Sequence, residues 1–176
     1  MGTPPFRKLL GLLPNTLSLS RLVLGICFPF LSPQWRIAAV AIAILTDFFD
    51  GITSRWLRIE SPIGRLLDPT ADKCFVFAVL ATWVCEGTLK PWQLTFIGAR
   101  DIVVLLGGIA AIASGKWSAV KMMVPSLLGK LATAAQFVFF GSVLWLGRAD
   151  LAAVLMTGAI SVAAAIDYVR RYSLGR

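Results

Sequence analysis

Apolar runs of membrane-spanning length dominate the sequence and leave it few possible folds. Six can be placed, each near the ~20 residues with which a helix crosses about 30 Å of hydrocarbon. They lie near residues 15–33, 35–54, 70–87, 92–114, 126–146 and 150–169. Hydrophobic residues make up 57% of the chain, more than in a typical soluble domain. We therefore predict an all-α, polytopic membrane protein with six transmembrane helices in a single domain, 1–176.

The basic residues predict an orientation for these helices. Threading the six runs alternately places one group on a single side: Arg7, Lys8, Arg55, Arg58, Arg65, Lys116, Lys121, Arg170, Arg171 and Arg176. The opposite loops hold only Arg36, Lys90 and Arg148. By the positive-inside rule, we expect both termini and the residues after the second run to face the cytoplasm. The segment 6–13 is short, basic and apolar, which predicts either an interfacial segment or a disordered tail.

The net charge of +8 indicates contacts with membrane and phosphate groups. No basic soluble module is available to bind nucleic acid, so we expect no nucleic-acid partner. The chain has no histidine, which excludes mechanisms that need a histidine base or nucleophile. Cys27, Cys74 and Cys85 are odd in number and lie within predicted spans, which favours apolar packing over a disulfide or metal site.

Four aspartates lie close together in a chain that has only nine acidic residues. Asp47 and Asp50 are three residues apart near the end of the second run, and Asp68 and Asp72 are four apart near the start of the third. On a helix each pair lies on one face. We expect Gly51, Pro62 and Gly64 to break the chain between the pairs, so that the two helix ends return together.

Four converging carboxylates at a membrane boundary would repel one another and lose hydration, at several kcal/mol each. Divalent cations remove that cost, and oxygen ligands suit Mg²⁺ or Mn²⁺. A two-metal site of this kind binds phosphates and stabilises displacement at phosphorus. Structural alternatives remain: the second pair could support a helix that starts at Pro69, and the first pair could form ion pairs with Arg55 or Arg58.

The aspartate stretch resembles the signature of the CDP-alcohol phosphatidyltransferase family, D-x2-D-G-x2-A-R-x8-G-x3-D-x3-D. Its eight fixed positions fall on Asp47, Asp50, Gly51, Ser54, Arg55, Gly64, Asp68 and Asp72, and seven of the eight match. The departure is Ser54, which stands where the family usually has alanine. This exchange of one small residue for another adds a hydroxyl and leaves the metal ligands unchanged.

Softer similarities extend over most of the chain. Residues 14–21, PNTLSLSR, resemble the P-N-x-L-T-x-x-R start of the first span in phosphatidylglycerophosphate synthases, with Ser18 replacing threonine. The segments 66–73, 99–101 and 129–136 resemble segments that those synthases share with eukaryotic-type cardiolipin synthases. The chain is thus most similar to this branch of the family.

The resemblance implies a donor, CDP-diacylglycerol, a leaving group, CMP, and two divalent cations, Mg²⁺ or Mn²⁺. It implies metal ligation by Asp47, Asp50, Asp68 and Asp72, with Asp72 also acting as the general base on the acceptor hydroxyl. It implies a nucleotide pocket that includes Gly51, Ser54, Arg55, Gly64, Asn15 and Ser18. It also implies a homodimer in the lipid bilayer.

Three basic residues inside the predicted spans bear on the acceptor. Arg21, Arg100 and Lys130 each cost energy in the membrane unless they meet water, a carboxylate or a ligand anion. Snorkelling or internal pairing, for instance of Arg100 with Asp101, would satisfy them. A phosphate pocket would also do so, and it favours glycerol 3-phosphate as the acceptor through charge-assisted hydrogen bonds.

Other functions fit parts of the pattern. Phosphatidylglycerol as acceptor would make the chain a cardiolipin synthase, and inositol phosphate would make it a phosphatidylinositol-phosphate synthase. A small membrane transporter would also contain charges within its spans. Transport carboxylates usually lie near mid-membrane in repeated halves, whereas these aspartates lie at one level near helix ends without an internal repeat. The sequence therefore favours the enzyme.

Overall fold

The computed structural model describes residues 13–57, 64–113 and 126–173, and its regular structure there is helical. The chain forms two compact units, Met1–Thr82 and Trp83–Arg176. The boundary lies within α4, Gly64–Cys85. The predicted all-α class is confirmed for these residues. The segment 6–13 lies almost entirely outside them, and the single domain stays a prediction.

The first unit begins with α2, Leu13–Cys27, a 3-10 turn, Phe28–Phe30, and α3, Pro33–Leu57. Pro33 opens α3, where the missing N–H of proline costs nothing, and the Ser32 carbonyl accepts from the next turn. Phe28 is fully buried and packs edge-on against Phe75 of α4, with ring centroids 6.2 Å apart. This packing joins the 3-10 turn after α2 to α4.

A glycine permits the close approach of α2 and α4. A Cβ at Gly25 would lie 3.2 Å from the Cα of Phe75, tighter than ordinary van der Waals contact. Gly25 is four residues after Arg21, so both lie on one face of α2. The contact at Gly25 therefore brings Arg21 toward α4.

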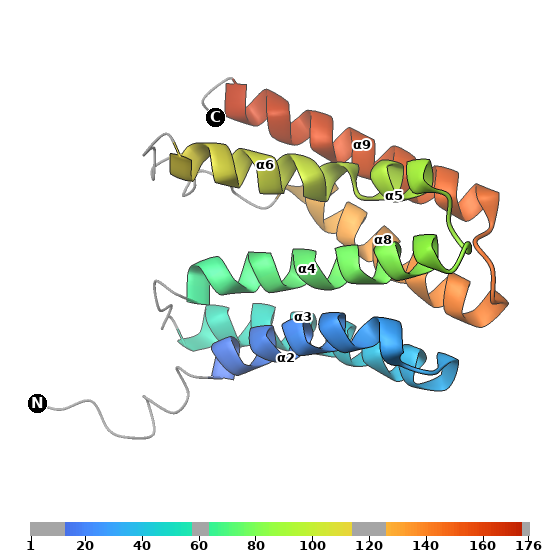
Figure 1. The fold of residues 1–176 in the computed structure, drawn as a ribbon. Helices are drawn as coiled ribbons and strands as arrows, with labels where there is room; N and C mark the ends of the chain where they lie inside the picture. Colours follow the sequence, from blue (N-terminus) through green and yellow to red (C-terminus); the bar gives the residue numbers. More distant parts are fainter. Residues whose placement is uncertain (1–12, 58–63, 114–125, 174–176) are drawn as a thin grey trace, which may run out of the picture. The chain divides into compact units, whose positions relative to one another are not determined.

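The second unit contains α5, Pro91–Ile97, α6, Ala99–Ala113, α8, Leu127–Leu146, and α9, Leu151–Ser173. Helix α9 contacts α5, α6 and α8, and Figure 1 shows it alongside α6. Ser126 caps α8 by accepting from the Gly129 N–H at 3.0 Å. The left-handed residue Gly147, with φ 65°, ends the same helix, as glycine commonly does.

The helix boundaries lie within six residues of those of the predicted spans, with two differences in continuity. The run 92–114 is divided at Gly98 into α5 and α6, at a residue with low helix propensity. Helix α3 continues through Gly51 to Leu57, so the prediction that Gly51 breaks the chain was wrong. Gly64 does mark a boundary, since α4 begins there, and Pro62 lies outside the described residues.

Two of the described helices are long and apolar enough to cross a membrane, namely α8 and residues Leu151–Arg171 of α9. A shorter apolar segment covers Leu19–Phe30. Helix α8 also exposes large apolar side chains, including Val138 and Trp145, as a lipid-facing helix does. These features support a membrane protein, while the count of six spans stays a prediction.

Candidate active site

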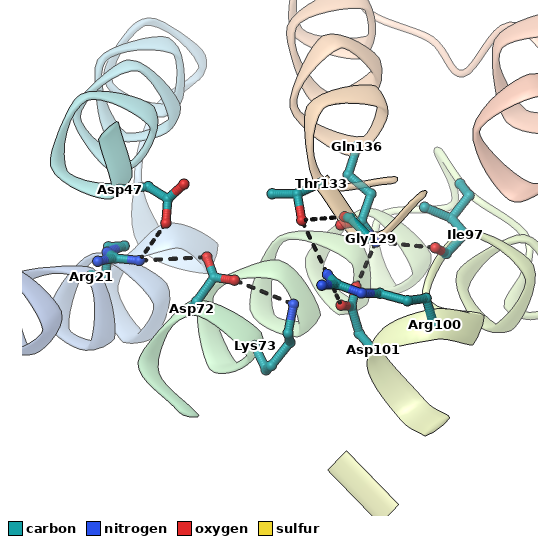
Figure 2. Close-up of polar contacts among 10 residues, drawn as sticks. All are labelled: Arg21, Asp47, Asp72, Lys73, Ile97, Arg100, Asp101, Gly129, Thr133 and Gln136. Carbon is teal, nitrogen blue, oxygen red and sulfur yellow. Dashed lines mark hydrogen bonds and ion pairs between the residues drawn. The ribbon is translucent and has the colours of Figure 1, made fainter. Parts of the chain in front are cut away.

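A buried arginine joins two of the predicted metal ligands in the first unit. Arg21 Nη1 donates to Asp47 Oδ1 at 3.2 Å and lies 3.6 Å from Asp72 Oδ1. Lys73 Nζ donates to the other oxygen of Asp72, at 3.3 Å. Figure 2 shows Arg21 joined by dashed lines to both carboxylates, and Lys73 on the far side of Asp72 from Arg21. Two cations and two anions from α2, α3 and α4 thus form one cluster.

The ion pairs of this cluster are largely buried, which makes each of them costly to break. The side chains of Arg21, Lys73 and Asp72 are 2%, 9% and 14% exposed, whereas that of Asp47 is 45% exposed. Removing one partner of a buried ion pair leaves the other charge uncompensated, at about 3–5 kcal/mol. The three helices are therefore held together by charges as well as by the Phe28–Phe75 contact.

Asp50 and Asp68 lie on the helices that the spacing predicted. Asp50 follows Asp47 on α3, and Asp68 precedes Asp72 on α4. Their side chains are outside the described residues, so the convergence of all four carboxylates stays a prediction. Helix α4 begins at Gly64, and Asp68 is therefore not the cap of a helix that starts at Pro69.

For the predicted nucleotide-binding residues, the structure likewise gives only the helix to which each belongs. Asn15 and Ser18 belong to α2, Gly51, Ser54 and Arg55 to α3, and Gly64 to the start of α4. Their side chains are not among those that the structure describes. Whether they line one pocket stays a prediction.

A second polar cluster surrounds Arg100 at the start of α6. Arg100 Nη1 donates to Asp101 Oδ1 at 3.2 Å and to Thr133 Oγ1 at 3.1 Å. Gln136 Nε2 donates to Asp101 Oδ2 at 2.6 Å and to the Ile97 carbonyl at 3.1 Å. Asp101 and Gln136 are almost fully buried. The internal pairing of Arg100 with Asp101, weighed above as the structural alternative, is therefore present.

The three predicted acceptor residues have different surroundings. Arg21 contacts the site aspartates, as described above. Lys130 is exposed on α8 and follows Gly129, where an added Cβ would lie 3.2 Å from Arg100 Nη2. Arg100 and Lys130 thus belong to neighbouring first turns of α6 and α8.

Sequence reasoning gave no role to Lys73, Thr133 or Gln136. Lys73 and Gln136 are polar residues within apolar runs, and this signal could have identified them, because polar groups within a membrane need partners. Thr133 carries no comparable signal, since threonine is common in helices of membrane proteins.

Comparison with known proteins identifies the family of the chain. The family described as CDP-alcohol phosphatidyltransferase matches residues 11–165, most of the chain. The chain belongs to the CDP-alcohol phosphatidyltransferase family. No solved structure matched the chain.

Several curated members of this family are similar to the chain. A CDP-diacylglycerol--glycerol-3-phosphate 3-phosphatidyltransferase of Aquifex aeolicus (strain VF5) is 36% identical over 68% of this chain and 68% of the relative. A protein of the same description from Cereibacter sphaeroides is 31% identical, over 77% of this chain and 63% of the relative. A putative cardiolipin synthase of Mycobacterium bovis is 30% identical, over 78% of this chain and 66% of the relative. The matches thus span about two thirds of these relatives.

The described residues of this phosphatidyltransferase fit the divalent cations that the family implies. Asp47 and Asp72 supply hard oxygen donors to one point, where a cationic group already lies between them. Asp72 Oδ1 is buried and makes no hydrogen bond to the described residues. A buried carboxylate oxygen without a donor can accept a cation. No group of three or more candidate ligands occurs among the described side chains, which do not include those of Asp50 and Asp68.

Proposed function

We propose that the chain transfers the phosphatidyl group of CDP-diacylglycerol to glycerol 3-phosphate, giving phosphatidylglycerophosphate and CMP. Family membership supports the reaction class, and the names of two relatives support both substrates. The observation that carries the proposal is the convergence of Asp47 and Asp72, two signature residues, on one buried cationic group.

Asp47, Asp50, Asp68 and Asp72 would hold two divalent cations, Mg²⁺ or Mn²⁺. Bound there, the cations would neutralise the pyrophosphate and make its lipid-side phosphorus electrophilic. Within the described cluster the charges of Arg21 and Lys73 offset those of Asp47 and Asp72. Asp50 and Asp68 add two negative charges, which supports a need for further cations.

Asp72 would serve as the general base. Its Oδ1 makes no hydrogen bond to the described residues, whereas Oδ2 accepts from Lys73. In the proposed step the acceptor hydroxyl gives its proton to the Asp72 carboxylate, and its oxygen forms a bond to the lipid-side phosphorus. The bond from that phosphorus to the CMP oxygen breaks, and CMP departs as an anion.

The family signature supports nucleotide binding by Gly51, Ser54, Arg55 and Gly64, and the resemblance of residues 14–21 to the first span of the synthases adds Asn15 and Ser18. Arg100 and Lys130 would bind the acceptor phosphate, because a guanidinium and an ammonium suit a phosphate anion. Arg21 was predicted to join them, but its contacts with Asp47 and Asp72 support a role in the aspartate cluster. The enzyme would be a homodimer with its active site and termini on the cytoplasmic side.

An acceptor panel tests the proposal. Purified protein receives labelled CDP-diacylglycerol and Mg²⁺ or Mn²⁺, then glycerol 3-phosphate, phosphatidylglycerol, inositol phosphate or serine separately. We expect CMP release with glycerol 3-phosphate. A preference for phosphatidylglycerol would instead favour a cardiolipin synthase, the description of a further relative.

The metal ligands are tested in the same assay. We expect Asp68→Asn to abolish CMP release, since an amide replaces a charged ligand. The matched control is Asp150→Asn, because Asp150 caps α9 by accepting from Ala152 N and Ala153 N, a role that asparagine also fills. Full activity of Asp68→Asn, or of the wild type in excess chelator, would contradict the metal assignment.

A further inference from the structure

The interruption between α5 and α6 places a buried carboxylate beside Arg100. Ile97 ends α5, and its carbonyl accepts from Gln136 Nε2 of α8. The same amide donates to Asp101 Oδ2 at 2.6 Å. Gln136 thus bonds to the end of one helix and to the first turn of the next. The Asp101 carboxylate, 0% exposed, is thereby fixed in orientation.

Asp101 in turn fixes one side of Arg100. Its Oδ1 accepts from Arg100 Nη1, and Thr133 Oγ1 accepts from the same nitrogen. The Thr133 hydroxyl donates to the Gly129 carbonyl at 3.2 Å, which leaves its lone pairs for Arg100. Both contacts therefore hold the same nitrogen of the guanidinium.

The remaining nitrogens of the guanidinium, Nη2 and Nε, have different surroundings. No hydrogen bond joins Arg100 Nη2 or Nε to any side chain or carbonyl within the described residues. Gly129 keeps the space beside Nη2 clear, because a Cβ there would lie only 3.2 Å away. A guanidinium with one nitrogen fixed can present its remaining donors to an anion in a set geometry.

The backbone of Arg100 is fixed as well. Its N–H donates to the buried Ser161 Oγ of α9 at 3.1 Å, although first-turn amides of a helix have no partner within the helix. The main chain and Nη1 of Arg100 are therefore fixed independently, by α9 and by α8.

We propose that Gln136 is a positioning residue for acceptor binding, which acts through Asp101 to set the direction of the Arg100 guanidinium. The inference rests on the proposed function, in which Arg100 binds the acceptor phosphate. Gln136 itself does not contact the acceptor. Its loss should loosen the guanidinium and raise the KM for glycerol 3-phosphate about tenfold, while the KM for CDP-diacylglycerol stays unchanged.

A double-mutant cycle separates positioning from general packing. Gln136→Met keeps the side-chain length and removes both hydrogen bonds, and Arg100→Gln removes the guanidinium. If Gln136 acts through Arg100, Gln136→Met raises the acceptor KM in the wild type but has no further effect in the Arg100→Gln background. A merely structural role would give the same effect in both. Ser142→Ala is the control, because Ser142 is on α8 and its one hydrogen bond among the described residues is local, to the Phe139 carbonyl.

The outcomes distinguish this inference from the proposed function. If Arg100→Gln raises the acceptor KM and Gln136→Met does not, the positioning role is wrong and the phosphate contact stands. If Arg100→Gln leaves the acceptor KM unchanged, both are wrong. Should Gln136→Met fail to fold, Gln136→Asn shortens the side chain by one methylene and draws its amide away from Asp101, while it keeps a polar group at the site. The same cycle is then run with that variant, and additive effects would overturn the proposal.

Discussion

Arg21 is a buried cation that contacts two aspartates. Its removal should therefore destabilise the protein by leaving their negative charges uncompensated. We predict that Arg21→Met lowers the melting temperature in chelator, because Asp47 and Asp72 lose the cation that they share. Removing one partner of a buried ion pair lowers the free energy of unfolding by about 3–5 kcal/mol. Added Mg²⁺ should restore more stability to the variant than to the wild type, since a metal cation replaces the lost charge. Thermal unfolding in detergent with chelator or with Mg²⁺ measures both effects.

Arg36→Met is the matched control at the residue scale. Arg36 donates to the Pro29 carbonyl at 3.2 Å and lies over the Phe28 ring, 5.4 Å from its centroid. Its loss should reduce stability equally with and without Mg²⁺. An identical response of the two variants to Mg²⁺ would contradict the shared-cation role of Arg21.

The close contact of α2 with α4 depends on the absence of a Cβ at Gly25. We predict that Gly25→Ala destabilises the protein and slows CMP release, because the new methyl would lie 3.2 Å from the Phe75 Cα. The resulting shift would move Arg21, on the same face, away from Asp72. Gly141→Ala is the control: its Cβ meets nothing within 4 Å, and alanine there should be neutral or stabilise α8 by up to ~1 kcal/mol. Equal melting temperatures for both variants would refute the tight contact.

The helices were largely predictable, since apolar length alone marks a span. The interruption at Gly98 was not, because a single glycine within an apolar run lowers helix propensity without always ending a helix, and the Gln136 side chain that bonds to the Ile97 carbonyl comes from a helix far along the sequence. The aspartate spacing predicted the pairs within α3 and α4 because i,i+3 and i,i+4 positions are local. The partner of Asp47 and Asp72 could not be predicted, since Arg21 reaches them through tertiary packing at Gly25.

At the scale of the whole molecule, charge asymmetry predicts which side of the membrane each loop faces. In a background with Cys27, Cys74 and Cys85 replaced by serine, we predict that Glu60→Cys reacts with an impermeant maleimide only after cells are permeabilised. Arg148→Cys, in the exposed connection before α9, should react in intact cells. Both results follow from the positive-inside rule. Labelling of Glu60→Cys from outside would reverse the orientation and separate the aspartates from cytosolic substrates.

The bond from the Arg100 N–H to Ser161 makes the first turn of α6 a reporter on α9. Amide protons at the start of a helix usually exchange quickly with solvent deuterium, because they lack a partner within the helix. The Arg100 proton has its acceptor on another helix, so its exchange requires α9 to move away. Its deuterium uptake therefore measures how often α9 undocks from α6, with the main-chain support of Arg100 lost each time.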